Sequence, residues 1–405
     1  MPFASWVTGC LLLASFSLQG QDARPASGNG GDLDQYIDYV LDHHPVLQAQ
    51  GREVDRTEAE FRSATRWDPL TAKGYYLPFS DVGDRYHEWE VSQAGLMPGA
   101  IRARSRYGAA VLSGVEADVR VFRQEFAGQT WNQAIDAWYW QSHAALLRQR
   151  LEGTEKWAEW YRLRAEAGLE TQAVAQAAAL QRAQHEAQLA RAEGTWEMLM
   201  AELRARAGGP FLEWERVELP ARCWENGPRP LGDSTANWAR LDARWAAAER
   251  AVEVAERERK WEQVGARPQW EVGWNQQGVP GAMYRGAMAG VVVPLAGRNA
   301  GVAQAHIAHL QAQEREKGVQ QELQAAVARE WEAYGNWMAV RAGLAYQLEN
   351  DATEEQMVQL LQAGGVAFPV FWAALESRRQ LEDTLLELDA ELLKLQGRIL
   401  NHRFQ

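Results

Sequence analysis

The sequence lacks the features that mark several common protein classes. Its 405 residues contain two cysteines, Cys10 and Cys223, too few for a disulfide framework or a structural zinc site. No run of 18 or more apolar residues follows the first 20, so we expect no spanning helix in the mature chain. A β-barrel stays open, because its signal per strand is weak. The net charge of −12 supplies no basic stripe, so we expect no nucleic acid as a partner.

Catalytic motifs are also lacking. His185-Glu186 would need a second histidine at position 189 to resemble a metalloprotease helix, and that position is Leu189. There is no nucleophile elbow, and the glycines at 28–31 follow no predicted strand. We therefore expect a protein that is not an enzyme and that has no cofactor and no metal site.

The amino-terminal segment predicts export. Residues 1–20 contain an apolar core followed by small residues, as in a secretory signal peptide. Val7-Thr8-Gly9-Cys10 resembles a lipoprotein box, but it precedes the leucines instead of following them. Residues 21–32 are small, polar and glycine-rich, which predicts a flexible lead-in.

Proline is missing from residues 100–208, and that stretch is rich in alanine, glutamate, glutamine, leucine and arginine. This composition favours two long helices, with Gly153-Thr154 as the expected bend between them. A helical pattern over 34–67 and two alternating stretches at about 71–79 and 86–96 precede them.

The second half repeats this order of elements. The pattern predicts a helix over 235–264, strands at 268–276 and 284–293, and helices over 299–350 and 353–400. Four prolines mark residues 210–234 as a linker, and residues 401–405 form a tail. The chain therefore divides into a first repeat, 33–209, and a second repeat, 235–400, which indicates an internal duplication.

Both predicted hairpins alternate between an apolar, aromatic face and a polar face. Five residues are candidates for a lipid-facing surface: Trp89, Val91, Trp270, Val272 and Trp274. Strands of about nine to eleven residues with this alternation suit a barrel wall between lipid and water. A soluble amphipathic hairpin packed on helices would give the same pattern.

Several segments resemble the TolC family of outer-membrane efflux proteins. The segment from Asp34 to Ala49 is similar to the opening helix of that family, with His44-Pro45 at its Asn-Pro step. Pro98-Gly99 and Arg102, at a strand-to-helix step, are most like the CzcC-like cation-efflux branch. Pro294, Gly297 and Arg298 resemble the matching step of the second repeat, and Leu375–Leu381 resembles a stretch of the last helix.

The resemblance implies a mainly α protein with a small β part. Long coiled-coil hairpins would form a periplasmic α-barrel, and four strands from each of three chains would form a 12-stranded outer-membrane β-barrel. It also implies a homotrimer that works with a periplasmic adaptor (a membrane fusion protein) and an inner-membrane transporter of the RND type. The function implied is a passive exit duct of a tripartite efflux system in the outer membrane, for heavy-metal cations or small toxic molecules. A soluble periplasmic scaffold or adaptor is the alternative.

Two further groups of residues bear on this picture. Three acidic residues lie at the predicted turn between the last two long helices: Asp351, Glu354 and Glu355. They either form a carboxylate ring at a pore mouth or cap the following helix. Trp131 and Trp138, like Trp238 and Trp245, are seven residues apart, which predicts packing between helices.

Overall fold

The structure is a computed structural model. It describes residues 30–64, 70–78, 85–95, 98–211, 214–219, 235–279, 282–293, 298–350, 354–362, 365 and 368–400. The predicted signal peptide, Pro294, Gly297, Asp351 and the tail at 401–405 lie outside these residues.

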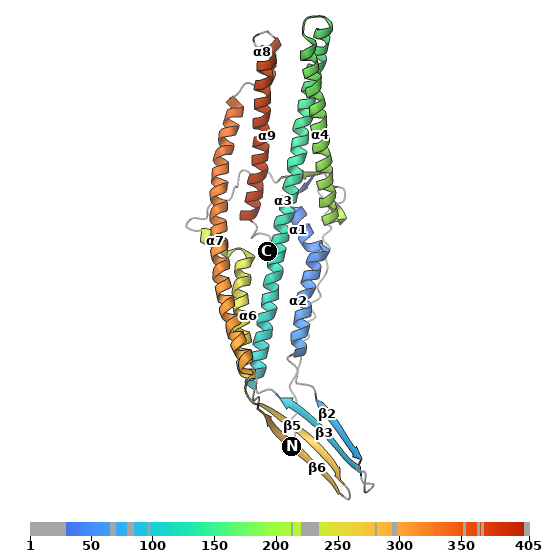
Figure 1. Ribbon diagram of the computed structural model, residues 1–405, viewed down its shortest axis with the longest axis vertical. Helices are drawn as coiled ribbons and strands as arrows, with labels where there is room; N and C mark the ends of the chain where they lie inside the picture. The colour runs from blue at the N-terminus through green and yellow to red at the C-terminus, as the bar shows by residue number, and fades with distance from the viewer. Residues whose placement is uncertain are drawn as a thin grey trace, which may run out of the picture.

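The molecule is a long shaft of helices with a small sheet at one end (Figure 1). The mainly α fold with one small antiparallel sheet confirms the predicted fold class. Helix α3 alone, Pro98–Glu166, has 69 residues, which corresponds to a length of about 100 Å.

The duplication is visible in the order of elements. The first repeat contains α1 (Leu33–His43), α2 (Pro45–Ala64), β2 (Thr71–Pro78), β3 (Arg85–Gly95), α3 and α4 (Gln172–Ala207). The second contains α5 (Thr235–Arg240), α6 (Ala243–Gly265), β5 (Gln269–Val279), β6 (Ala282–Val292), α7 (Arg298–Asn350), α8 (Glu354–Gln362) and α9 (Phe368–Ile399).

The two hairpins join into one sheet with the order β2-β3-β5-β6, all antiparallel. The central pair, β3 and β5, brings the two repeats together with His87 opposite Gly278 and Gly95 opposite Trp270. Among the described residues, β2 and β6 each have a neighbour on one side only.

The largest apolar core lies where α1 packs against α3 and α4, with part of α9. Tyr36 is fully buried there, stacks on Trp214 with ring centroids 4.6 Å apart, and donates a 2.9 Å hydrogen bond to the carbonyl of Leu203. Trp131 donates to the carbonyl of Leu393, 3.0 Å away, which ties α3 to α9. A second cluster, with Trp157, joins α3 to α8 and α9 nearer the far end.

The predicted role of the spaced tryptophans is confirmed. Trp131 and Trp245 are buried in separate clusters between helices, and Trp138 packs against the first of these. The ring of Trp238 lies 5.9 Å from that of Trp331 on α7.

The predicted bend at Gly153-Thr154 is wrong, because α3 continues through it to Glu166. Thr154 is buried, and its hydroxyl donates to the carbonyl of Arg150, 2.8 Å away, as helix-interior threonines do. The chain turns instead after Glu166, where Gly168 has a φ of +68° that side chains with a Cβ rarely adopt.

Three other predicted helices are divided. Pro45 begins α2 where its missing N–H costs nothing, so the first helix breaks at His44. Asp242 caps α6 and accepts from the backbone N–H of Arg244, 2.9 Å away, which separates α5 from α6. The last predicted helix is two, α8 and α9, with Gly365 between them.

The predicted lead-in and linker both contain a strand. Gly30–Asp32 forms β1, which pairs in parallel with β4, Arg216–Glu218. A 3-10 turn, Gly209–Phe211, precedes β4. The linker therefore packs against the shaft through Trp214 and Val217, which are both buried.

Candidate functional site

The strand register places all five predicted lipid-facing residues on one face of the sheet. Val91 lies opposite Trp274, and Trp89 lies opposite Gln276 on the same face. Trp270, Val272 and Trp274 alternate along β5 toward this face. Trp89 is 58% exposed, Val272 47% and Trp274 50%, which is far more than large apolar side chains of a soluble core. We call this surface, on the two central strands and their neighbours, the aromatic face.

Aromatic rings on this face lie over glycines of the neighbouring strand. Trp89 lies over Gly74 of β2, and a Cβ added there would come within 3.0 Å of its ring. Trp270 covers Gly95, where a Cβ would collide with the indole. The sequence analysis missed these pairs, because a glycine reveals its partner only when the register is known.

Other apolar residues on the aromatic face were also missed. The register places Tyr76 of β2 and Met283 and Val291 of β6 on it, and all three are exposed. Their signal in the sequence is the same alternation, continued into the outer strands. The apolar surface therefore extends across all four strands of the described sheet.

The opposite face carries all the acidic side chains of the central strands, and we call it the polar face. The aromatic face is not wholly apolar, because the register places Gln93, Gln276 and Arg285 on it. Asn275 donates to a carboxylate oxygen of Glu88 across β3 and β5, 2.7 Å away. Lys73 and Glu90 are register partners whose charged groups lie 3.6 Å apart. Exposed Tyr75 and Tyr284 also lie on this face. The sheet thus separates an apolar surface from a hydrogen-bonding one.

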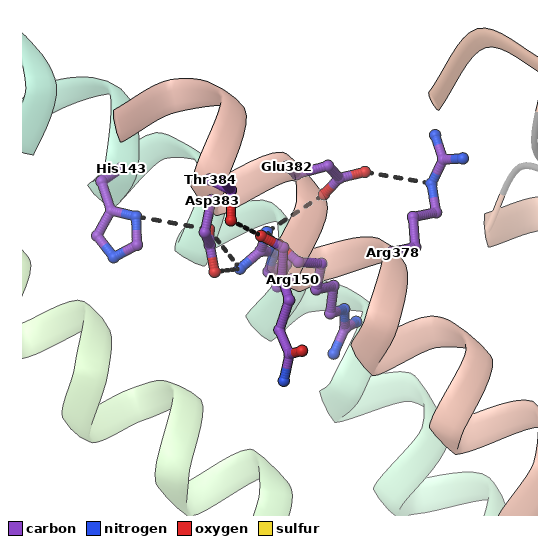
Figure 2. Close-up of polar contacts among 8 residues, drawn as sticks. His143, Arg150, Arg378, Glu382, Asp383 and Thr384 are labelled. Atoms are coloured by element: carbon purple, nitrogen blue, oxygen red, sulfur yellow. Dashed lines mark hydrogen bonds and ion pairs between the residues drawn. The ribbon is translucent and has the colours of Figure 1, made fainter. Parts of the chain in front are cut away.

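The shaft contains an ionic cluster around one buried arginine, which the sequence analysis did not identify (Figure 2). Arg150 of α3 has a side chain that is 7% exposed. It donates to Asp383 of α9 at 2.9 Å, to the carbonyl of Arg379 at 2.9 Å and to Glu382 at 3.2 Å. Figure 2 shows this guanidinium between the two acids, with His143 on the far side of Asp383. The cluster fixes α9 against α3.

Two histidines border the ionic cluster. His185 of α4 is buried, and its Nδ1 lies 3.0 Å from the hydroxyl of Thr154. Burial, together with the charges of Arg379 and Arg150, lowers the pKa of His185 to about 4. Burial also lowers the pKa of His143, although the charge of Asp383 opposes this shift. Both rings are neutral at pH 7, which avoids a further buried cation beside Arg150.

The remaining candidate residues lie at junctions between elements. Pro98 and Gly99 begin α3, three residues after β3 ends, and Arg298 is the first residue of α7. Glu354 and Glu355 begin α8, at the end of the shaft opposite the sheet (Figure 1). The described step residues therefore lie at the starts of the long helices α3 and α7, and the described tip residues at the start of the short helix α8; their roles stay predictions.

Among the described residues, no group of three or more histidine, cysteine, aspartate or glutamate side chains could hold a metal ion. Within the same residues, no helix combines the length and the hydropathy that a membrane-spanning helix needs.

Solved structures of outer-membrane channels share this fold. VceC, an outer-membrane protein of Vibrio cholerae, is 17% identical with a TM-score of 0.74, over 91% of this chain and 95% of that one. The outer-membrane channel OprN is 16% identical with a TM-score of 0.76, over 91% and 89%. The MtrE channel of Neisseria gonorrhoeae is 14% identical with a TM-score of 0.69, over 92% and 88%.

No protein-family profile matches the sequence, and no curated protein is similar to it in sequence. The likeness therefore rests on three-dimensional structure. It defines the class: the chain has the TolC-like fold of outer-membrane efflux channels, which confirms the resemblance seen in the sequence at the level of the fold.

Proposed function

We propose that this protein is the outer-membrane channel of a tripartite efflux system. The observation that carries the proposal is the four-stranded sheet, which exposes an aromatic face, is polar on the other side and has an open edge on each outer strand. The similarity to solved outer-membrane channels supports the same role. No feature of the described residues favours the alternative, a soluble periplasmic scaffold.

The open edges determine what the sheet needs in a bilayer. Unpaired backbone N–H and C=O groups are too costly in hydrocarbon, so a sheet in lipid must close. Four strands of 8 to 11 residues cannot close on themselves, so further copies must supply the missing neighbours. We infer a homotrimer in which β6 of one copy pairs with β2 of the next. The aromatic face then meets lipid and the polar face lines the lumen.

The helical shaft gives this barrel a periplasmic extension. Helices α3 and α7 leave the sheet end, and α8 lies at the opposite end (Figure 1). We infer that three shafts form a tunnel that meets a periplasmic adaptor and an inner-membrane transporter, of the RND type. Conduction is passive, and the pump supplies the energy. No reaction is assigned to the chain, and its cargo would be heavy-metal cations or small toxic molecules.

Two sets of residues receive roles under this proposal. The steps at Pro98-Gly99 and at Pro294, Gly297 and Arg298 redirect the chain from the tilted strands into the shaft. Asp351, Glu354 and Glu355 lie at the periplasmic mouth, where converging carboxylates favour cations.

Cell fractionation with an unboiled gel tests the proposal. The full-length protein should be recovered with outer membranes and migrate as a trimer unless it is boiled, because a closed barrel resists detergent. A soluble monomer in the periplasm would contradict both the channel and the trimer.

A further inference from the structure

A strongly basic groove lies where the shaft meets the sheet. It occupies about 360 Å³ between the first turns of α3 and the last turns of α6. Five basic side chains and no acidic one line it: Arg102, Arg106, Arg257, Lys260 and Arg267. In a chain of net charge −12, this concentration of one sign needs an explanation.

Internal ion pairs account for only part of this charge. Arg257 pairs with Glu253 at 3.6 Å, and Lys260 pairs with Glu256. Arg102, Arg106 and Arg267 form no ion pair with any residue that the structure describes, and all three are exposed. Three guanidinium groups therefore line one groove, two from α3 and one from the turn between α6 and β5, with their fork-shaped donors available to an anion.

The position of the groove narrows the class of anion. Arg267 is two residues before β5 begins, and Arg102 is in the second turn of α3, just after the end of β3. Trp270, at the same end of β5, lies on the aromatic face, as tryptophans do at a membrane interface. If the sheet lies in the bilayer, the groove lies at the depth of the phosphate groups of the periplasmic leaflet.

We propose that this groove binds a phosphate group, an inference that rests on the membrane placement proposed above. Arginine pairs bidentately with phosphate oxygens, and the first turns of α3 and the turn after α6 place the three unpaired arginines around one volume. The phosphate comes from the headgroup of an anionic phospholipid or from a free phosphate anion, and these two sources can be separated by experiment.

The test uses purified full-length trimer in a neutral detergent. Binding would be measured by calorimetry with three probes: a short-chain phosphatidylglycerol below its micelle concentration, the matching phosphatidylcholine, and inorganic phosphate. The variant replaces the unpaired arginines (Arg102→Gln, Arg106→Gln, Arg267→Gln). The control replaces three exposed arginines elsewhere on the shaft (Arg191→Gln, Arg315→Gln, Arg329→Gln).

We expect wild type and control to bind phosphatidylglycerol more tightly than phosphatidylcholine, and added salt to weaken the binding. The glutamine variant should bind about tenfold more weakly or worse. If inorganic phosphate binds as well as phosphatidylglycerol, the groove is a free-anion site. If only the lipid binds, it is a headgroup site.

Equal binding by wild type and the glutamine variant, or no binding of either anion by wild type, would overturn the proposal. Should the glutamine variant fail to fold, the corresponding lysine variant keeps the charge and should retain most of the binding. The unboiled gel reports separately on the channel: a wild-type protein that forms trimers but does not bind phosphate defeats only this inference.

Discussion

Val272 and Glu271 are neighbours in β5 whose side chains point to opposite faces of the sheet. The proposed orientation makes different demands on them, because the aromatic face meets hydrocarbon and the polar face meets water. An arginine on a lipid face costs roughly 2–4 kcal/mol at mid-membrane depth and roughly 0–1 kcal/mol near the interface, and Val272, the fourth residue of β5, lies between these depths. Val272→Arg should therefore reduce the amount of heat-resistant trimer strongly, as measured on an unboiled gel.

Glu271→Arg is the matched control, since it places the same side chain one residue away on the polar face. It should assemble like wild type. If both variants assemble equally well, the orientation of the sheet or its place in lipid is wrong.

His185 gives a second prediction for a single residue. Its pKa falls from 6.5 to about 4 on folding. Between these two pH values the unfolded chain binds a proton at His185 and the folded protein does not. By linkage, the contribution of His185 to the free energy of unfolding is fully present above pH 6.5. It decreases by about 2 kcal/mol as the pH falls toward 4. Thermal unfolding at pH 7.5 and pH 4.5 measures the loss.

His185→Gln cannot titrate, but its amide N–H can still donate to the Thr154 hydroxyl oxygen, whose own proton goes to the carbonyl of Arg150, so this variant should lose less stability in acid than wild type. His306→Gln, at an exposed histidine of α7, should behave like wild type. An identical acid-induced loss in wild type and His185→Gln would show that other groups, such as His143, are responsible.

At the scale of elements, the contact between α3 and α9 depends on one buried arginine. Arg150→Leu would leave Asp383 and Glu382 facing each other without their common donor. Removing one partner of a fully buried pair costs about 3–5 kcal/mol. Asp383 and Glu382 are 37% and 28% exposed, however, and Glu382 keeps Arg378. We therefore expect a loss of about 1.5–3 kcal/mol and a lower unfolding temperature.

Arg162→Leu supplies the comparison on the same helix. Arg162 also pairs with two acids, Glu159 and Glu166, but it is 52% exposed. Exposed pairs contribute about 0–1 kcal/mol, so this variant should unfold near the wild-type temperature. Similar losses from both substitutions would mean that the cluster at Arg150 does not hold α9 in place.

The elements also show how far the sequence determines the structure. The alternation of Trp270, Val272 and Trp274 predicts the strand and the face that these side chains share, because a strand repeats every two residues whatever its neighbours are. The position of the helical turn is not local in this way. Gly153 costs only about 1 kcal/mol inside a helix, and Arg150 and Thr154 make tertiary contacts that keep the helix continuous. The turn falls at Gly168 instead, where the backbone requires a positive φ.

The contacts of the site were less predictable than its faces. The pairing of Trp89 with Gly74 and of Asn275 with Glu88 depends on register, which is set by the whole sheet. The ionic cluster joins residues more than 200 positions apart, so no spacing rule could indicate it.

At the scale of the whole molecule, the tip opposite the sheet should determine ion selectivity. Three copies of Asp351, Glu354 and Glu355 would bring like charges together in a narrow mouth. The variant Asp351→Asn, Glu354→Gln, Glu355→Gln should lower cation selectivity and weaken block by divalent cations in single-channel recordings. High salt should reduce the wild-type selectivity, since screening acts within about 8–10 Å.

A charge-matched control removes Asp55, Glu58 and Glu60 of α2, nearer the sheet, and should leave block by divalent cations unchanged. If the tip variant keeps the wild-type selectivity and block, the three acids serve only to cap the N-terminus of α8 and to interact with its helix dipole.

The two open edges of the sheet also have a genetic consequence. Along β6, the N–H groups of consecutive residues such as Ala287 and Met288 point alternately to β5 and to the open edge. A proline at a position of β6 whose N–H faces the open edge cannot donate to β2 of the next subunit, but it leaves the subunit's own β2 edge intact. The altered subunit therefore still joins other subunits through β2 and prevents the ring from closing at β6. Co-expressed in equal amounts with wild type, it should leave only about one eighth of randomly mixed trimers intact. Such an allele should be dominant, whereas a proline that breaks the pairing with β5 should remove its own subunit from assembly and be recessive.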